Sequence, residues 1–97
     1  MRVLPEPLSF EWDAGNTNKN YEKHLVTNQE AEEVFINQPI VVIADAKHSM
    51  TEPRFQALGK TNNSRPLFLS FTIRNNKVRI ISIRNMNKKE KKEYEKF

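Results

Sequence analysis

The sequence contains no cysteine, so disulfides, cysteine nucleophiles and thiolate metal sites are excluded. Glycine occurs only at Gly15 and Gly59, which leaves no glycine-rich loop of the kind that holds a nucleotide phosphate. No apolar run approaches the roughly 18 residues of a membrane-spanning helix, and no Gly-x-Ser-x-Gly hydrolase motif is present. Because Met1 to Leu8 lacks the apolar segment of a signal peptide, we expect a soluble cytoplasmic protein with no membrane partner.

Metal and cofactor chemistry is not expected either. The two histidines, His24 and His48, are 24 positions apart, and neither belongs to a ligand pair at helical spacing. An enzyme built on this chain would therefore need no cofactor and would work with Lys, Arg, His, Glu and Tyr side chains.

Charge is distributed unevenly along the chain. Residues 1–53 hold 4 Lys/Arg and 9 Asp/Glu, a net charge of −5, whereas residues 54–97 hold 12 and 3, a net charge of +9. A basic half on a small protein indicates a phosphate backbone or an acidic protein as partner. A basic surface that faces only water is the alternative.

The best-defined stretch runs from Pro66 to Arg84, where two runs rich in β-branched and aromatic residues flank Asn75-Asn76. Asparagine tolerates the positive φ of a tight turn, so we expect a β-hairpin. A two-residue loop pairs Ile73 with Val78, and Phe71 with Ile80, on a buried face. The opposite face then carries polar residues near the turn and apolar residues farther away: Thr72, Arg74, Lys77 and Arg79, then Phe68, Ile81 and Ile83.

The chain as a whole, residues 1–97, is predicted to form a single domain with one modest core. The expected elements are a short strand at Phe10–Asp13, a helix at about Ala14–His24 capped by Asp13, a helix opened by the capping box Thr27–Glu30 and ended before Pro39, strands at Ile40–Ala44 and Arg54–Lys60, and a helix at Asn87–Phe97. This order predicts an α+β fold, a mostly antiparallel sheet with two N-terminal helices and one C-terminal helix, all on one face.

The polar loop Asp45–Pro53 holds two candidate proton-transfer groups, His48 and Glu52. An imidazole exchanges protons near neutral pH, and a nearby carboxylate can orient it or act as the base. A loop histidine bonded to the backbone is the alternative reading. Tyr94 is expected to be half buried, with its hydroxyl directed toward the sheet.

Strand arginines are the candidate phosphate ligands. Arg54, Arg79 and Arg84 present planar forks that suit a phosphate, and ion pairs with the acidic N-terminal half are the alternative. Lys88 and Lys89 lie in the first turn of the expected C-terminal helix, where they oppose its dipole, which indicates use in ligand binding. The expected RNA contacts are these two lysines, Lys88 and Lys89, together with Arg74 and Lys77 at the hairpin.

These residue types suit metal-independent RNA cleavage. A ribose 2′-hydroxyl attacks the adjacent phosphate, so a base, an acid and cations for the transition state are needed. Two other readings fit the basic half equally well: a nucleic-acid-binding module without catalysis, and an interaction protein for an acidic partner.

Several short blocks of residues follow one another in a fixed order along residues 10–95. The first half contributes Phe10-x-Trp12-Asp13, Asn20, Lys23-His24-x-Val26, Glu30-Ala31 and Val34-Phe35. The second half contributes Asp45-x-x-His48-Ser49, Glu52-x-Arg54, Gly59, Arg65, Phe71-Thr72-x-Arg74, Arg79-Ile80-Ile81-Ser82-x-Arg84, Glu90 and Tyr94. In combination these blocks resemble the BrnT toxins of bacterial type II toxin–antitoxin modules.

The resemblance implies a RelE-like ribonuclease that halts translation and is neutralised in a hetero-oligomeric complex by a BrnA-like, DNA-binding antitoxin. It also implies catalytic positions: His48, Glu52, Arg54, Arg79, Arg84 and Tyr94. We expect Arg79 and Arg84 to hold the phosphate, and Glu52 or His48 to take the proton. The hairpin register places the two arginines on opposite faces of one strand unless a bulge intervenes.

Overall fold

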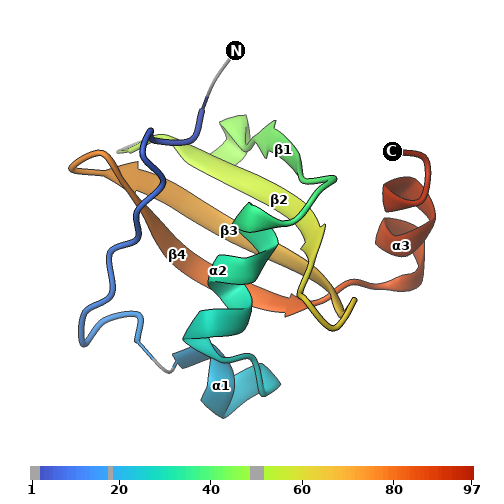
Figure 1. Ribbon diagram of the computed structural model, residues 1–97. Helices are drawn as coiled ribbons and strands as arrows, with labels where there is room; N and C mark the ends of the chain where they lie inside the picture. The colour runs from blue at the N-terminus through green and yellow to red at the C-terminus, as the bar shows by residue number, and fades with distance from the viewer. Residues whose placement is uncertain (1–2, 18, 49–51) are drawn as a thin grey trace.

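A computed structural model of the chain describes residues 3–17, 19–48 and 52–97, apart from the side chains of Asn20 and His48. Within these residues, four strands form one antiparallel sheet in chain order: β1 Val41–Ala44, β2 Arg54–Lys60, β3 Pro66–Arg74 and β4 Lys77–Asn85 (Figure 1). Three α-helices and a short 3-10 helix accompany the sheet: α1 Lys19–His24, α2 Asn28–Ile36, α3 Lys88–Tyr94 and η1 Ala46–His48. None of the helices described is long and apolar enough to cross a membrane.

The β3–β4 hairpin forms as the sequence predicts. Asn75 and Asn76 have φ of 53° and 59°, the positive values that a two-residue hairpin loop requires. Ile73 pairs with Val78 in the expected register. The turn chemistry therefore fixes the pairing of the first residues on either side of the loop.

A β-bulge interrupts this hairpin farther from the turn. Phe71 pairs with Ile80, whereas the preceding Ser70 pairs with Ser82, so Ile81 is an extra residue in β4. One added residue exchanges the two faces for everything beyond it in the strand. The faces predicted for the far half of β4 are therefore reversed.

Two predictions change because of the bulge. Ile83, predicted on the polar face, points into the core and is 1% exposed. Arg84 pairs with Phe68, and Arg79 pairs with Thr72. Since Phe68 and Thr72 are four residues apart on β3, Arg79 and Arg84 lie on the same face of the sheet rather than on opposite faces.

The two faces of the sheet carry different layers. The inner face, which bears Leu67, Leu69 and Phe71, packs against α2, where the Phe35 ring meets the Phe71 ring edge-on at 5.1 Å. The core of fully or nearly fully buried side chains lies in this layer: Val26, Ala31, Val34, Phe35, Ala57, Leu67, Leu69, Phe71, Val78, Ile80 and Ile83.

Helix α3 lies against the opposite, outer face, which bears Phe68, Ser70 and Thr72. Residues of α3 and the outer-face positions Val41, Leu58 and Phe68 line one cavity together. The prediction of helices on one face is therefore wrong for α3. The reason is that Arg84, turned outward by the bulge, binds Glu90 of α3 through both oxygens at 2.9 and 3.0 Å.

The N-terminal segment runs along β4 instead of forming the predicted strand Phe10–Asp13. A single parallel bridge joins Phe10 to Val78, with the Val78 N–H donating to Ser9 at 2.8 Å and the Glu11 N–H donating to Val78 at 2.9 Å. This short pairing places Glu11 beside the outer face, next to β4.

The first helix starts later than predicted. Ala14–Thr17 forms a turn in which the Asp13 carboxylate accepts from the Gly15 N–H at 2.8 Å, so Asp13 caps a turn rather than a helix. Asn16 is buried, and its side-chain amide donates to the carbonyl of Ile80 at 3.3 Å. Asparagine and glycine favour such side-chain and backbone bonds over helix, which explains the shortened helix.

The capping box at Thr27 forms as predicted, and α2 ends at Ile36. Helix α3 has its own capping box, in which Asn87 and Glu90 bond each other's backbone N–H groups. It ends at Tyr94, earlier than the predicted Phe97, whose ring is mostly exposed.

Gly59 of β2 lies directly against Val34 of α2. A Cβ at this position would lie 2.7 Å from Cγ1 of Val34 and 3.3 Å from the Val34 carbonyl oxygen. We expect Gly59→Ala to lower the free energy of unfolding by about 1–3 kcal/mol, because the helix must move outward. Urea denaturation of the wild type, Gly59→Ala, Val34→Ala and the double variant checks this. Gly59→Ala should cost less in the Val34→Ala background than in the wild type, and equal stability of Gly59→Ala and wild type would contradict the steric account.

Candidate functional site

The outer face is organised in three rows of cross-strand neighbours on β2, β3 and β4. The rows are Arg54–Thr72–Arg79, then Gln56–Ser70–Ser82, then Leu58–Phe68–Arg84. They change in character from cationic, through small and polar, to largely apolar. Neighbours within a row are separated by about 5 Å, the spacing of adjacent strands.

Arg79 is a largely enclosed cation of the first row. Its side chain is 15% exposed and donates to Glu11 Oε1 at 2.9 Å and to both Asp13 oxygens at 2.7 and 3.1 Å. Hydrogen bonding to Arg79 is the main cause of the lowered pKa of the Asp13 carboxyl. The alternative foreseen from the sequence, an ion pair with the acidic N-terminal half, is thus present at Arg79.

Thr72 separates the two arginines of this row. It is fully buried, and its hydroxyl donates to the carbonyl of Pro53. Because Thr72 is small, the longer side chains of Arg54 and Arg79 flank it on the outer face. This geometry suits an anion held by two guanidinium groups.

A third arginine connects the row to the loop before β2. Arg74 donates to both oxygens of Glu52 at 3.2 Å, and it lies 3.8 Å from Glu11. Lys77 is its exposed partner across the hairpin. The structure thus brings Glu52, Arg54, Arg74 and Arg79 together at one end of the outer face, which we call the arginine cluster.

His48 ends η1, which begins just after β1. The N–H of Asp45, the residue before η1, donates to the carbonyl of Arg54 at 2.8 Å, so η1 starts beside the arginine cluster. The His48 side chain lies outside the described residues, and its catalytic role remains a prediction.

Arg84 and Tyr94 lie away from the arginine cluster. Arg84 lies two rows from Arg79, a separation of roughly 13 Å along the strands. Its guanidinium stacks over the Phe68 ring at 4.2 Å and binds Glu90. Tyr94 donates its hydroxyl to the carbonyl of Pro39 at 2.6 Å, and burial raises its pKa. These contacts attach α3 to the sheet, and they do not place Arg84 at the same phosphate as Arg79.

The four lysines of α3 form an exposed basic surface beside the apolar row. Lys88, Lys89, Lys91 and Lys92 all belong to it. The predicted RNA contacts therefore lie in two groups, Arg74 and Lys77 at the hairpin and Lys88 and Lys89 at α3.

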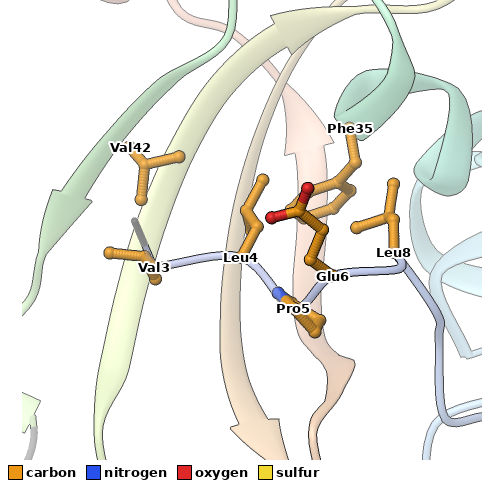
Figure 2. Close-up of a pocket in the computed structure, with 7 residues that line it drawn as sticks. All are labelled: Val3, Leu4, Pro5, Glu6, Leu8, Phe35 and Val42. Carbon is orange, nitrogen blue, oxygen red and sulfur yellow. The ribbon is translucent and has the colours of Figure 1, made fainter. Parts of the chain in front are cut away.

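The inner face offers a different kind of site. A cavity of about 670 Å³ lies between the N-terminal segment, α2 and β1 (Figure 2). Apolar side chains line most of it: Val3, Leu4, Pro5, Leu8, Phe35 and Val42. Among the described residues that line it, the one charged side chain is Glu6, which would repel a phosphate. The described residues also contain no cluster of His, Cys, Asp or Glu that could hold a metal ion.

Two carboxylates that contact the arginine cluster, Glu11 and Asp13, were not among the predicted site residues. They precede the predicted catalytic residue Arg79 by 68 and 66 positions. Only the parallel pairing of the N-terminal segment with β4 brings them close to it. The available signal was their alternation with Phe10 and Trp12, which places both acids on one side of an extended segment.

The Arg84–Glu90 pair makes stability depend on pH. Hydrogen bonding to Arg84 is the main cause of the lowered pKa of Glu90, whose usual value is 4.5. A folded-state pKa below the unfolded value means that this stabilisation is complete above about pH 4.5 and is lost as pH falls through the folded pKa. We expect Glu90→Gln, which keeps the capping box, to cost about 1 kcal/mol at pH 7 and progressively less as pH falls below about 4.5.

Urea denaturation at several pH values measures this difference. Glu95→Gln, a neutralisation of an exposed acid at the end of the same helix, is the matched control and should change little at either pH. A Glu90→Gln deficit that stays constant down to pH 3 would show that the ion pair is not its source.

The comparison with protein families gives one match. A model of the family described as ribonuclease toxin, BrnT, of type II toxin-antitoxin system matches residues 12–90. No curated protein matches the chain. The matched range includes Asp13 and the whole arginine cluster.

Proposed function

The chain belongs to the BrnT family of type II toxin–antitoxin ribonuclease toxins, and we propose that it cleaves RNA at the arginine cluster without a metal ion. The family match is the observation that carries the activity. The location is supported by the row Arg54–Thr72–Arg79, which presents two guanidinium groups on either side of a small residue. A RelE-like relationship of the fold is part of the same proposal.

In the proposed reaction, Arg54 and Arg79 bind the scissile phosphate and stabilise the extra negative charge of the transition state. Glu52 takes the proton of the 2′-hydroxyl, whose oxygen then attacks phosphorus. The bond from phosphorus to the 5′-oxygen breaks, and His48 supplies the proton that this oxygen takes up. The products are a 2′,3′-cyclic phosphate and a 5′-hydroxyl end.

Substrate must compete with the carboxylates that now occupy Arg79. Asp13 is 51% exposed at its side chain, so its ion pair is the more easily exchanged of the two. A phosphate entering from solvent would replace Asp13 on the guanidinium, while Glu11 keeps Arg79 in place. Arg74 holds Glu52 through both carboxylate oxygens and so orients the proposed base.

The biological role follows from the family. We propose that cleavage of cytoplasmic RNA halts translation, that Lys88 and Lys89 add RNA contacts, and that a BrnA-like, DNA-binding antitoxin neutralises the toxin in a hetero-oligomeric complex. The arginine cluster has to be inaccessible to RNA in that complex.

Incubation of the purified, antitoxin-free chain with RNA in EDTA tests the activity. We expect fragments that end in 2′,3′-cyclic phosphate. Fragments that appear only when a divalent cation is restored would contradict metal independence. RNA that stays intact, also with translating ribosomes, but binds with an affinity that falls linearly with log salt would support a binding module instead.

A further inference from the structure

A second cavity lies on the outer face, on the same side of the sheet as the arginine cluster. Its volume is about 340 Å³, and it is enclosed between α3 and the first three strands. The largely apolar row supplies its floor through Leu58 and Phe68, and Val41 extends this floor onto β1. The cavity is thus the far end of the surface on which the proposed catalytic residues lie.

The lining combines a flat apolar floor with hydrogen-bonding walls. Gln56 and Asn87 contribute amides, and Glu90 and Glu93 of α3 contribute carboxylates. Arg84 holds both oxygens of Glu90, which leaves Glu93 to read a ligand. Sites for small planar ligands have this composition, with apolar walls and a few polar groups that read the edge of the ligand. A nucleobase has the matching chemistry, since it has two apolar faces and a polar edge.

Nothing bulky separates the cavity from the arginine cluster along β3 and β4. The row between them contains Gln56, Ser70 and Ser82, and rows follow each other at about 6.6 Å along the strands. The first and third rows are therefore roughly 13 Å apart, a distance that an extended RNA strand crosses within a few nucleotides.

Two cations stand at the rim of the cavity, one of which, Arg84, is paired with Glu90. Lys89 lines it, and Arg84 stands beside it, stacked over the Phe68 ring at 4.2 Å. Positive charge at the rim favours a ligand that carries phosphates next to its bases. The inner-face cavity has no such cation among the described residues that line it.

We propose that this outer-face cavity is a nucleobase subsite that selects the RNA sequence near the cleaved bond. The proposal rests on the proposed ribonuclease function and adds specificity to it. Glu93 acts as the reading residue, because a carboxylate only accepts hydrogen bonds and therefore favours a base with an exocyclic amino group over uracil. Phe68 and Leu58 contact the face of that base.

Binding of 2′-O-methyl trinucleotides, which lack the attacking hydroxyl, tests the subsite independently of cleavage. Fluorescence anisotropy gives the dissociation constants of adenine, cytosine, guanine and uracil versions for three proteins: wild type, Glu93→Gln and Glu95→Gln. Both variants remove one negative charge from an exposed position near the end of the last helix, but Glu95 does not line the cavity. The change in overall charge therefore affects all four trinucleotides alike, and it cancels when the dissociation constant for one base is divided by that for another.

We expect the wild type and Glu95→Gln to bind an amino-bearing base about fivefold more tightly than uracil, and Glu93→Gln to lose this preference. Equal preferences in Glu93→Gln and wild type, or no preference in the wild type, would overturn the subsite. The proposed function is judged separately. A wild type that discriminates between bases but cleaves no RNA contradicts the ribonuclease proposal alone, and one that cleaves without discrimination contradicts the subsite alone.

Discussion

Replacing Arg79 with alanine is expected to lower kcat/KM for RNA cleavage by at least about 100-fold, the effect of removing one donor to a developing negative charge. Arg79 is a largely enclosed cation of the row Arg54–Thr72–Arg79, and its fork donates to Glu11 and to the exposed Asp13, which a phosphate can replace. Arg79→Lys keeps the charge but loses the fork, so we expect it to recover only a small part of the activity. Single-turnover cleavage of a labelled RNA in EDTA measures both variants.

The loss of cleavage activity in Arg79→Ala has two possible causes, the missing phosphate ligand and the missing ion pairs between Arg79 and the N-terminal segment. The variant Asp13→Asn removes the exposed charge pair but keeps the guanidinium and Glu11, and the introduced amide oxygen can still accept from the Gly15 N–H. We expect this control to cleave RNA at least as fast as the wild type. If it were as inactive as Arg79→Ala, or if Arg79→Ala stayed fully active, Arg79 would not be a phosphate ligand.

Replacing Phe71 with alanine is expected to cause the largest loss of stability, about 3–5 kcal/mol of the free energy of unfolding. The Phe71 side chain is fully buried at the centre of the inner face. Its ring lies 5.1 Å from that of Phe35 and 5.4 Å from that of Phe55, so the change opens a cavity between α2 and two strands. A domain of this size has roughly 5–15 kcal/mol in total, and such a variant would be near unfolding at physiological temperature.

Urea denaturation followed by circular dichroism measures this effect. Phe97→Ala is the matched control, because the same side chain is removed from a position that is 70% exposed, and we expect a change within about 0.5 kcal/mol. Comparable losses for the two variants would contradict the assignment of the core to the inner face.

The parts of the fold that local sequence determines were predictable. The Asn75-Asn76 turn fixes its hairpin through positive φ, and the capping box at Thr27 fixes the start of α2. The bulge at Ile81 was not predictable, because an extra residue in a strand of alternating character leaves no composition signal. Its effect extends to the tertiary level, since it turns Arg84 toward Glu90 and thereby directs α3 to the outer face.

The candidate site was predictable in its residue types but only partly in its grouping. Glu52, Arg54, Arg74 and Arg79 come together because β2, β3 and β4 are sequential neighbours. Arg84 and Tyr94 were predicted to join the same site. Arg84 instead lies at the other end of β4, and Tyr94 lies on α3. Glu11 and Asp13 joined the cluster through a long-range parallel contact, which pattern and propensity do not encode.

The measurement that tests the central claim most directly is an NMR titration of the 15N-labelled chain with a non-cleavable 2′-O-methyl RNA. The side-chain Nε–Hε signals, assigned through single Arg→Lys variants, report each guanidinium separately. We predict that the signals of Arg54 and Arg79 shift as RNA is added and reach a plateau when the site is saturated. The signal of Arg65, which lies beside the helices and donates to the carbonyls of His24 and Leu25, should stay in place. Shifts at Arg65 with unchanged Arg54 and Arg79 would contradict an RNA site at the arginine cluster.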